Sequence, residues 1–400
     1  MARTIFVTGG TGFVAGRFIE VALRDSATRV RALVRDPRRA ERLLRWSSDR
    51  VEIVRGDLLD GQAVLGAVAG ATHVLHAAYG TDGTDEEQYR ATVEGARNVL
   101  DAAREHGPRR VIILSSLAVY DWGTGSRIDE SSPLAVSGDA YARSKIEVER
   151  LAREAFDRYQ TPTVVLQPSL VWGPGSETWT TSFLDALDEG PVPLVDGGAR
   201  ACPLVYVDDV VDAVLRAFEA PGIEGERFLI SSGERTTWRD LLQGYRALLG
   251  RGELVDVASE QLRRDAGIVR RVRSLVSALP RTLAAVQNDS DLRRAVRRLP
   301  IVDALLRLAP GARRVLSLAR RRPVARSAAA VPPGECPQIA TTGPLPAIHP
   351  DRLRLYAADL EVDAARARRV LGFEPRYCLE RGLDRVRAWA EHQGRTAPLF

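Results

Sequence analysis

The chain has 400 residues, of which 45% are hydrophobic and 27% are charged, a composition typical of a globular protein with a large buried core. No apolar run reaches the roughly 18 residues of a membrane span, and the first residues lack the basic and apolar regions of a signal peptide. Cys202, Cys336 and Cys378 lie far apart, which argues against a disulfide framework and a zinc site. We therefore expect a cytoplasmic protein without a bound metal.

The formal net charge of +5 has a local origin. Residues 257–330 contain 17 arginines and five acidic residues, a net charge of about +12, so the remainder carries about −7. Because the basicity is confined to one segment, we expect no nucleic-acid binding. The segment predicts three or four amphipathic helices within a basic insertion at about 257–350. Two interpretations stay open: a solvated helical decoration, or contact with an anionic substrate, a carrier or an acidic membrane surface.

The first predicted element is a strand at residues 4–7, followed by a glycine-rich turn at residues 8–16 and a helix that runs to residue 23. This arrangement places a pyrophosphate on a helix N-terminus, where free N–H groups and the helix dipole favour anions. Gly9 permits the tight turn, and Gly12 lets the backbone approach the phosphates. The turn therefore predicts a dinucleotide-binding site.

The second predicted strand, residues 30–34, bears on the choice of dinucleotide. In such folds the end of this strand meets the adenosine ribose, where an acid binds the 2′-hydroxyl of NAD(H) and an arginine accommodates the 2′-phosphate of NADP(H). Arg35, backed by Arg38 and Arg39, favours NADP(H). Asp36 keeps NAD(H) open as the alternative.

The rest of the first half repeats the alternation of strand and helix. Further strands are predicted at 51–54, 72–78, 110–114 and 163–166, and helices at 62–69, 86–105 and 140–158. Six alternations indicate an α/β protein with a Rossmann-type, doubly wound parallel sheet and right-handed crossovers. Such sheets bind ligands at the carboxyl ends of their strands. We therefore expect Ala77, Ala78 and Ser116, which end the fourth and fifth strands, to line the site.

The predicted helix at 140–158 carries a candidate catalytic pair. Lys145 is the only lysine of the chain, and the other 56 basic residues are arginines. Tyr141 precedes it by four residues, so both side chains share one helix face. A neighbouring cation favours the phenolate, so Lys145 is predicted to lower the pKa of Tyr141 from its ordinary value of about 10. Tyr141 then becomes a general acid or base, and Ser116 a hydrogen-bond donor to the same substrate oxygen.

Taken together and in order, these motifs resemble the extended short-chain dehydrogenases/reductases, also called the NAD-dependent epimerase/dehydratase family. The motifs that carry the resemblance are Thr8–Phe13, Gly56-Asp57-Leu58, His76-Ala77-Ala78, Ser116 with Tyr120, Tyr141-x-x-x-Lys145, Pro168–Gly175 and Val205–Val210. The resemblance covers residues 3 to about 250 and resumes at about 356–390. It implies an enzyme that binds NAD(P) and transfers hydride at a secondary alcohol or ketone carbon.

The resemblance also implies roles for the site residues. Ser116, Tyr141 and Lys145 would be catalytic, with Lys145 also holding the nicotinamide ribose. The residues predicted to bind the cofactor, from the turn, the strand ends and the resemblance, are Gly9, Thr11, Gly12, Phe13, Val14, Arg35, Asp57, Leu58, Ala77, Ala78, Lys145 and Pro168. Substrate contacts are predicted for Tyr79, Tyr120 and Arg200.

Some positions depart from the family pattern. Thr92 stands where asparagine is usual, which predicts a different bracing of the active-site strand. Gln167 replaces the arginine that usually precedes the proline. Sugar-nucleotide members usually carry a diphosphate-binding arginine at the position of Cys202, whereas here the arginine is Arg200, two residues away. This departure weakens the case for a nucleoside-diphosphate sugar as substrate.

We expect two domains. The dinucleotide-binding domain would comprise residues 1–174 and 201–232, and a smaller substrate lobe residues 175–200 and 233–400. The predicted function is an NAD(P)-dependent oxidoreductase acting on a small molecule, a sugar or sugar-like intermediate by family resemblance alone. An NAD-recycling sugar-nucleotide epimerase and a non-catalytic NAD(P)-sensing protein are the alternatives. Leu117 and Ala118 replace the acidic pair of the dehydratases, which argues against dehydration, and dimers are usual in the family, so a homodimer is expected.

Overall fold

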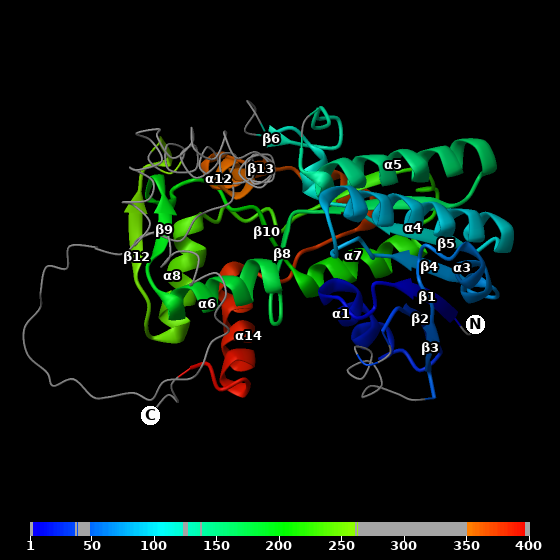
Figure 1. Ribbon diagram of the computed structural model, residues 1–400, viewed down its shortest axis with the longest axis horizontal. Coiled ribbons are helices and arrows are strands. Elements are labelled where there is room, and N and C mark those ends of the chain that lie inside the picture. Colours follow the sequence, from blue (N-terminus) through cyan, green and yellow to red (C-terminus); the bar gives the residue numbers. More distant parts are fainter. Residues whose placement is uncertain are drawn as a thin grey trace, which may run out of the picture. The chain divides into compact units, whose positions relative to one another are not determined.

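The computed structural model describes residues 3–36, 38, 49–122, 127–136, 138–260, 262 and 350–396. The chain divides into two units, Met1–Ser259 with Leu345–Phe400, and Glu260–Pro344. Every element labelled in Figure 1 belongs to the first unit. Nearly all of the second unit lies outside the described residues, and with it the predicted arginine-rich helices of the basic insertion.

A seven-stranded parallel sheet forms the centre of the first unit (Figure 1). Its strands are β1 (Arg3–Thr8), β2 (Thr28–Val34), β3 (Val51–Arg55), β4 (His73–His76), β5 (Arg110–Leu114), β7 (Thr163–Pro168) and β11 (Arg227–Ile230). Their order is β11-β7-β5-β4-β1-β2-β3, with every pair parallel. The order reverses between β1 and β4, the switch point at which such sheets bind ligands. The predicted doubly wound fold is therefore confirmed.

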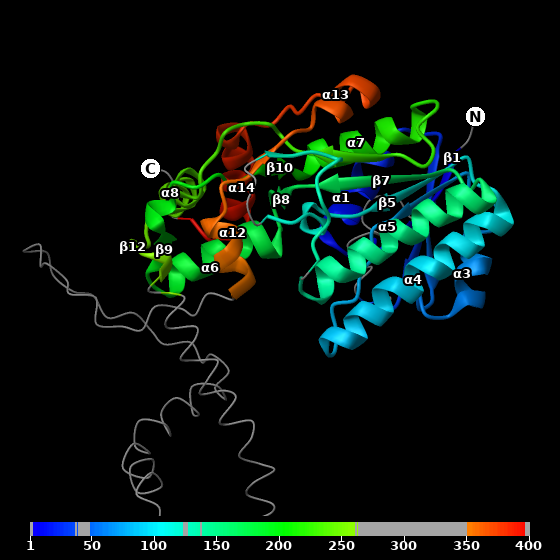
Figure 2. The ribbon, with the colours of Figure 1, turned by 90° about the horizontal axis from the view of Figure 1, so that it is seen from above.

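Helices cover both faces of this sheet (Figure 2). One face carries α1 (Phe13–Ala22) and α7 (Val207–Glu219), and the other carries α3 (Gly61–Val68), α4 (Asp85–His106) and α5 (Ala140–Tyr159). Successive side chains of a strand point to opposite faces, so Val7 belongs to the core under α1 and α7, whereas Phe6 belongs to the core under α3, α4 and α5. The sheet is thus buried on both sides, which suits its continuous apolar strands.

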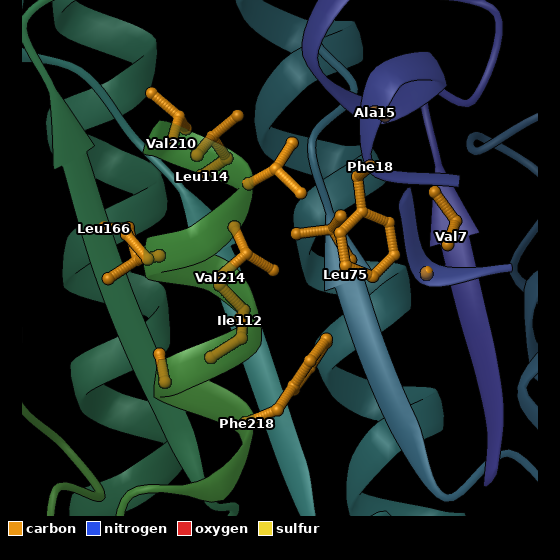
Figure 3. Close-up of a cluster of buried hydrophobic side chains, with 14 of the residues drawn as sticks. Val7, Ala15, Phe18, Leu75, Ile112, Leu114, Leu166, Val210, Val214 and Phe218 are labelled. Atoms are coloured by element: carbon orange, nitrogen blue, oxygen red, sulfur yellow. The ribbon is translucent and has the colours of Figure 1, made fainter. Parts of the chain in front are cut away.

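Figure 3 shows the core between the sheet and the first helix layer. It joins strand residues Val7, Leu75, Ile112, Leu114 and Leu166 to helix residues Ala15, Phe18, Val210, Val214 and Phe218. Phe18 and Phe218 meet edge to face, with ring centroids 6.0 Å apart. Each large apolar side chain contributes roughly 1.5–3 kcal/mol by burial. This packing fixes α1 directly behind the glycine turn that precedes it.

The two long helices of the opposite face begin and end at local sequence features. In α4, Thr84 and Glu87 form a capping box at the start, and Gly107 adopts the left-handed conformation after the last turn. In α5, the Asp139 carboxylate accepts a hydrogen bond from the N–H of Ala142 at 2.7 Å. Because this cap starts α5 at residue 140, Tyr141 lies in its first turn, next to the carboxyl edge of the sheet.

The rest of the first unit consists of short elements. Its strand pairs are β8 (Leu170–Trp172) with β10 (Leu204–Tyr206), β9 (Val192–Val195) with β12 (Leu254–Val257), and β6 (Arg127–Ile128) with β13 (Glu361–Val362). Its helices are the π-helix η3 (Glu177–Thr181), α6 (Ser182–Glu189), the 3₁₀ turn η4 (Asp196–Gly198), α8 (Trp238–Leu249), α12 (Pro350–Ala357), α13 (Ala365–Leu371) and α14 (Leu379–His392). Aromatic side chains pack against one another in this part of the unit, namely Trp172, Trp179, Phe183, Tyr206, Trp238, Tyr245, Tyr356 and Tyr377.

One buried carboxylate ties the last part of the chain to the sheet layer. Asp209, on α7, accepts hydrogen bonds from the backbone N–H groups of Arg376 at 2.9 Å and Tyr377 at 3.2 Å. Burial raises the pKa of Asp209 to about 6. The segment at 350–396 therefore joins the unit through specific contacts, although the basic insertion separates it in sequence from the rest.

Among the described residues, seven strands lie outside the six that the sequence predicts, namely β6 and β8 to β13. The turn-rich passage at 167–175 contains β8, and the seventh sheet strand β11 was not predicted. Both are short, and each pairs with a strand far away in the sequence, β10 and β7 respectively. Tertiary pairing, not local periodicity, makes them strands. No helix among the described residues is both long and apolar enough to cross a membrane.

Candidate active site

The turn between β1 and α1 presses against the end of β4. Gly9 has φ +71°, and a Cβ at this position would lie 2.9 Å from the backbone nitrogen of Ala78. Gly12 donates its N–H to the Gly9 carbonyl at 2.8 Å, which closes the turn. Only glycine fits at position 9, because both the positive φ and the close approach to the Ala78 backbone exclude a side chain. The turn and the fourth strand end thus form one continuous backbone surface.

The N-terminus of α1 opens onto this surface with free donors. Gly12 is its N-cap, no side chain caps the helix, and its first turn contains no acidic residue. The helix begins at Phe13, four residues earlier than predicted, so Phe13 and Val14 present their N–H groups at the helix end. A free, dipole-positive helix N-terminus after a glycine turn suits a pyrophosphate. The predicted residues Gly9, Gly12, Phe13, Ala77 and Ala78 therefore lie together, and the exposed Thr11 lies within the same turn.

Thr8 and His76 lock the two strand ends to each other. The Thr8 hydroxyl accepts hydrogen bonds from the N–H groups of Ala77 at 3.2 Å and Ala78 at 3.3 Å, and lies 2.9 Å from His76 Nδ1. Because both lone pairs are used, Thr8 donates its proton to Nδ1, which places the imidazole hydrogen on Nε2. Burial, with Lys145 as the second cause, lowers the pKa of His76 to about 3.

His76 Nε2 is buried and has no hydrogen-bond partner among the described residues. An unpartnered buried donor beside a strand-end site is a place where a bound molecule or a water supplies the acceptor. Together with the Gly9 approach and the free helix end, it fits a bound dinucleotide. The sequence motif drew attention to His76, but its tautomer depends on Thr8, 68 residues away.

The end of β2 carries the predicted determinants of cofactor choice. Arg35 is 60% exposed and pairs with Asp82 at 2.6 Å. Arg38 is also exposed, and Arg39 lies outside the described residues. Asp57 shapes the turn after β3, because its carboxylate accepts from the N–H of Leu59 at 2.9 Å. Arg35 thus lies directly after β2, at the carboxyl edge of the sheet, and pairs with Asp82 from the loop after β4.

Ser116, Tyr141 and Lys145 meet at the carboxyl end of β5. Ser116 follows that strand, and its Oγ accepts from the N–H of Ala118 at 3.1 Å, where the 3₁₀ turn η2 (Leu117–Val119) begins. The Lys145 ammonium is buried, donates to the Leu114 carbonyl at 2.8 Å, and lies 5.7 Å from the Tyr141 ring centroid. Tyr141 and Lys145 therefore share one helix face, as predicted. The Lys145 ammonium contacts the end of β5, two residues before Ser116.

The pKa of Tyr141 differs from the prediction. Burial raises it to about 12, and a hydrogen bond with Ser116 acts in the opposite direction. The predicted lowering by Lys145 is wrong for this structure. The ammonium is itself desolvated, which lowers the pKa of Lys145 to about 8, and it points at the Leu114 carbonyl. Tyr141 is therefore a protonated phenol.

Among the residues predicted to contact substrate, Tyr79 lies next to Tyr141 and Lys145. Its ring meets that of Tyr141 edge to face, with centroids 5.4 Å apart, and lies 5.7 Å from Lys145 Nζ. Tyr79 is 50% exposed. Burial raises the pKa of Tyr79, and the carboxylate of Glu177, at the start of η3, acts in the same direction.

Two other predicted substrate residues are placed differently. Tyr120 is buried in the core, and its hydroxyl donates to Gln167 Oε1 at 2.8 Å, so it does not reach an open surface. The prediction for Tyr120 is therefore corrected: its phenol is used inside the protein. Arg200 is half-exposed and lies 3.9 Å from the carboxylate of Asp359.

Three departures from the family pattern also have structural outcomes. Thr92 braces the loop after β4, because its hydroxyl accepts from the N–H of Gly80 at 2.9 Å. Gln167 and the predicted cofactor residue Pro168 end β7 at the same edge of the sheet, and both are buried. Cys202 is 0% exposed, and burial raises its pKa. In the described part of the chain, no group of three or more His, Cys, Asp or Glu residues could hold a metal ion.

Comparison with known proteins identifies the family. The model of the NAD dependent epimerase/dehydratase family matches residues 5–231, more than half of the chain. The chain belongs to this family. Its relatives are NAD(P)-dependent reductases, dehydratases and epimerases of the extended short-chain dehydrogenase/reductase type, which confirms the predicted family, fold and enzyme class.

Among the relatives in sequence is 2-alkyl-3-oxoalkanoate reductase of Stenotrophomonas maltophilia (strain K279a), 34% identical over 62% of this chain and 76% of that protein. A second is 4-hydroxy-2-methyl-3-oxo-4-farnesyl-3,4-dihydroquinoline-1-oxide ketoreductase of Stigmatella aurantiaca, 32% identical over 61% of this chain and 75% of that protein. Among solved structures, dTDP-glucose 4,6-dehydratase from Bacillus anthracis, in complex with NAD, has the same fold with a TM-score of 0.65 and 16% identity, covering 98% of this chain and 97% of its own.

The glycine turn gives a first test. Replacement of Gly9 with alanine (Gly9→Ala) forces a Cβ onto the Ala78 backbone and a strained φ, which costs about 1–3 kcal/mol. We expect the affinity for NAD(H) and NADP(H), measured by fluorescence titration, to fall about tenfold or more.

The matched control is Gly66→Ala, in helix α3, where nothing lies within 4 Å of an added Cβ. This variant is expected to keep its cofactor affinity and to gain up to about 1 kcal/mol of stability. Equal affinities for both glycine variants would contradict the proposed cofactor site.

Proposed function

We propose that this enzyme catalyses the net NAD(P)-linked interconversion of a ketone and a secondary alcohol, with Tyr141 exchanging the proton. The observation that carries the proposal is the convergence of Ser116, Tyr141 and Lys145 at the carboxyl end of β5. The glycine turn meets the neighbouring strand end β4 in the same sheet. One edge of the sheet therefore offers both a dinucleotide cradle and a tuned proton donor.

Each side chain has a defined task. A bound nicotinamide supplies or accepts the hydride. Tyr141, whose pKa is raised to about 12, holds its proton for the carbonyl oxygen of a ketone. Ser116 accepts from Ala118 and hydrogen-bonds Tyr141, and its O–H can turn from Tyr141 to donate to the same substrate oxygen. Lys145 uses one of its three donors on Leu114, which leaves two for the hydroxyls of a ribose.

The surroundings of Ser116 favour net redox chemistry over dehydration. Leu117 and Ala118 form the 3₁₀ turn that directly follows the serine. Elimination of water needs an acid and a base beside the substrate, and neither side chain can supply one. The raised pKa of Tyr141 also keeps the phenol protonated, which is the form that ketone reduction uses. We therefore propose reduction as the chemical direction that the site supports best.

We further propose that the substrate is a ketone on a largely apolar skeleton, without a nucleoside diphosphate. Two relatives in sequence are reductases of an oxoalkanoate and of a farnesylated quinoline oxide, by their names. Cys202, at the position where sugar-nucleotide members usually carry an arginine, is fully buried, and Arg200 lies next to Asp359. Tyr79 adds an aromatic surface beside Tyr141. The alternative is a sugar-like substrate, as expected from the resemblance. By its name, the dTDP-glucose 4,6-dehydratase with the same fold acts on such a compound.

Tyr141→Phe tests the proton donor. The aromatic ring stays and only the hydroxyl is lost, so cofactor affinity is expected to remain, while ketone reduction slows about 10²- to 10⁴-fold through the loss of general-acid catalysis. Consumption of the reduced nicotinamide is followed by its absorbance. The control is Tyr159→Phe, at the other end of the same helix, where the ring is 51% exposed. Equal rates for Tyr141→Phe and the unmodified enzyme would contradict the proposal.

The substrate class is tested with two panels of compounds. We expect kcat/KM for 2-alkyl-3-oxo acids and polycyclic ketones to exceed that for UDP-glucose and dTDP-glucose at least about tenfold, since apolar contacts discriminate to that extent. Measurement is by nicotinamide absorbance in both reaction directions. A preference for the nucleotide sugars would overturn the apolar assignment and favour the sugar-like class.

NADP(H) is the proposed cofactor, on the strength of Arg35 at the end of β2. Arg35→Ala should weaken NADP(H) about tenfold or more, the value of a hydrogen bond to a charged group, and leave NAD(H) unchanged. Asp82→Asn removes the acid that pairs with Arg35 and should tighten NADP(H). The exposed Arg24→Ala serves as the charge-matched control. Equal losses of both cofactors in Arg35→Ala would contradict a phosphate role.

Several expectations stay predictions. The homodimer, the cytoplasmic location and the division into a dinucleotide-binding domain and a substrate lobe follow from the sequence and the family resemblance. The role of the basic insertion, including contact with an acidic membrane surface, also stays a prediction, because the insertion lies almost wholly outside the described residues.

A further inference from the structure

A buried carboxylate lies one helical turn after the candidate catalytic lysine. Glu149 follows Lys145 by four residues on α5 and is only 7% exposed. It accepts a hydrogen bond from the Ser115 hydroxyl and two from Gln167 Nε2, at 2.9 and 3.0 Å. The mechanism proposed for Tyr141 does not use this group. A buried carboxylate is costly unless it has a structural or chemical task.

The partners of Glu149 come from several elements. Gln167, on β7, is a neutral amide that also accepts from the hydroxyl of Tyr120 at 2.8 Å. Arg227, on β11, is the nearest described guanidinium, 3.9 Å away. Burial raises the pKa of Glu149, while Ser115, Gln167, Arg227 and Lys145 act in the opposite direction, in that order. The carboxylate thus faces two cations, and one of them is the candidate catalytic lysine.

Glu149 and Lys145 form hydrogen bonds with consecutive residues at the end of β5. Lys145 donates to the carbonyl of Leu114, and the next residue, Ser115, donates its hydroxyl to Glu149. The residue after that is Ser116. Two adjacent turns of α5 therefore hold the backbone that presents the candidate catalytic serine, so a change at Glu149 reaches Ser116 and Lys145 together.

We propose that Glu149 is a positioning residue of the active site, which holds Ser115 in place and keeps the buried ammonium of Lys145 charged. This inference rests on the proposed catalytic roles of Ser116, Tyr141 and Lys145. Glu149 touches neither substrate nor cofactor in this proposal. It acts through the strand end and through its charge.

The charge effect has a definite sign. Burial lowers the pKa of Lys145 to about 8, and Glu149 acts to raise it. The other titratable groups facing Lys145 are the neutral His76 and the protonated phenols of Tyr79 and Tyr141. A lysine with a lowered pKa loses its charge as the pH rises through that value. Removing the charge of Glu149 therefore moves the loss of the Lys145 charge to lower pH.

The single lysine makes this titration directly measurable. Lysine labelled with ¹³C at Cε gives one side-chain resonance, because Lys145 is the only lysine of the chain. We expect its chemical shift in the full-length protein to titrate with a midpoint near 8. In Glu149→Gln the midpoint should fall by about half a pH unit or more, since even a modest charge interaction shifts a pKa that far. An unchanged midpoint would overturn the proposal.

Three further variants separate charge from folding. Glu147→Gln, on the same helix, removes a carboxylate that pairs with Arg150, and should leave the midpoint in place. Ser115→Ala keeps the carboxylate of Glu149 and removes the hydroxyl that it holds, so ketone reduction should slow with a smaller shift of the midpoint than in Glu149→Gln. Gln167→Arg adds a cation against Glu149 and should lower the midpoint even if Glu149→Gln does not fold. A midpoint unmoved by Gln167→Arg would count against the proposal.

Failure of this inference is distinguishable from failure of the proposed function. The Lys145 midpoint is measured without substrate, so it does not depend on the reaction. An active Tyr141→Phe enzyme would refute the proposed function, whatever the midpoint. With Tyr141→Phe inactive, an equal midpoint in Glu149→Gln and the unmodified protein would refute only the role of Glu149. The rate of ketone reduction is also measured against pH in both proteins. A lowered Lys145 midpoint in Glu149→Gln, together with a loss of rate that begins at lower pH, supports both the role of Glu149 and the proposed function.

Discussion

The site depends above all on the contact between the first three turns of α5 and the end of β5. The Lys145 ammonium on the Leu114 carbonyl, and the Ser115 hydroxyl on Glu149, fix the helix to the strand at two adjacent residues. Without them, Tyr141 and Ser116 would belong to elements free to shift against each other. Proton transfer requires hydrogen-bond distance, so this contact precedes the chemistry.

A second close contact prepares the cofactor side. Gly9 approaches Ala78 so closely that no side chain fits, and Thr8 ties the same two strand ends together through Ala77, Ala78 and His76. The resulting backbone surface ends at the uncapped N-terminus of α1. The proposed cofactor site and the proposed proton donor therefore lie at neighbouring strand ends, each fixed by its own set of buried contacts.

Burial sets the electrostatics of the site more than charge pairing does. Desolvation raises the pKa of Tyr141 and lowers those of Lys145 and His76. All three shifts favour uncharged forms, so the phenol of Tyr141 stays protonated. A carbonyl oxygen that gains negative charge there would draw strongly on both hydroxyl donors. The same desolvation gives a single carboxylate such as Glu149 its influence over the lysine.

Local sequence determined much of this protein. Strand periodicity, the glycine turn, the Tyr141–Lys145 spacing and Ser116 after an apolar strand depend on neighbouring residues, so six strands, the fold and the family could be predicted. Tertiary structure decided the rest: β8 and β11 exist through distant partners, Tyr120 turned inward to Gln167, and Ser115 met Glu149. The direction of the Tyr141 pKa shift belongs to this second group, because desolvation depends on what the whole fold packs around a phenol, and spacing along one helix does not encode it.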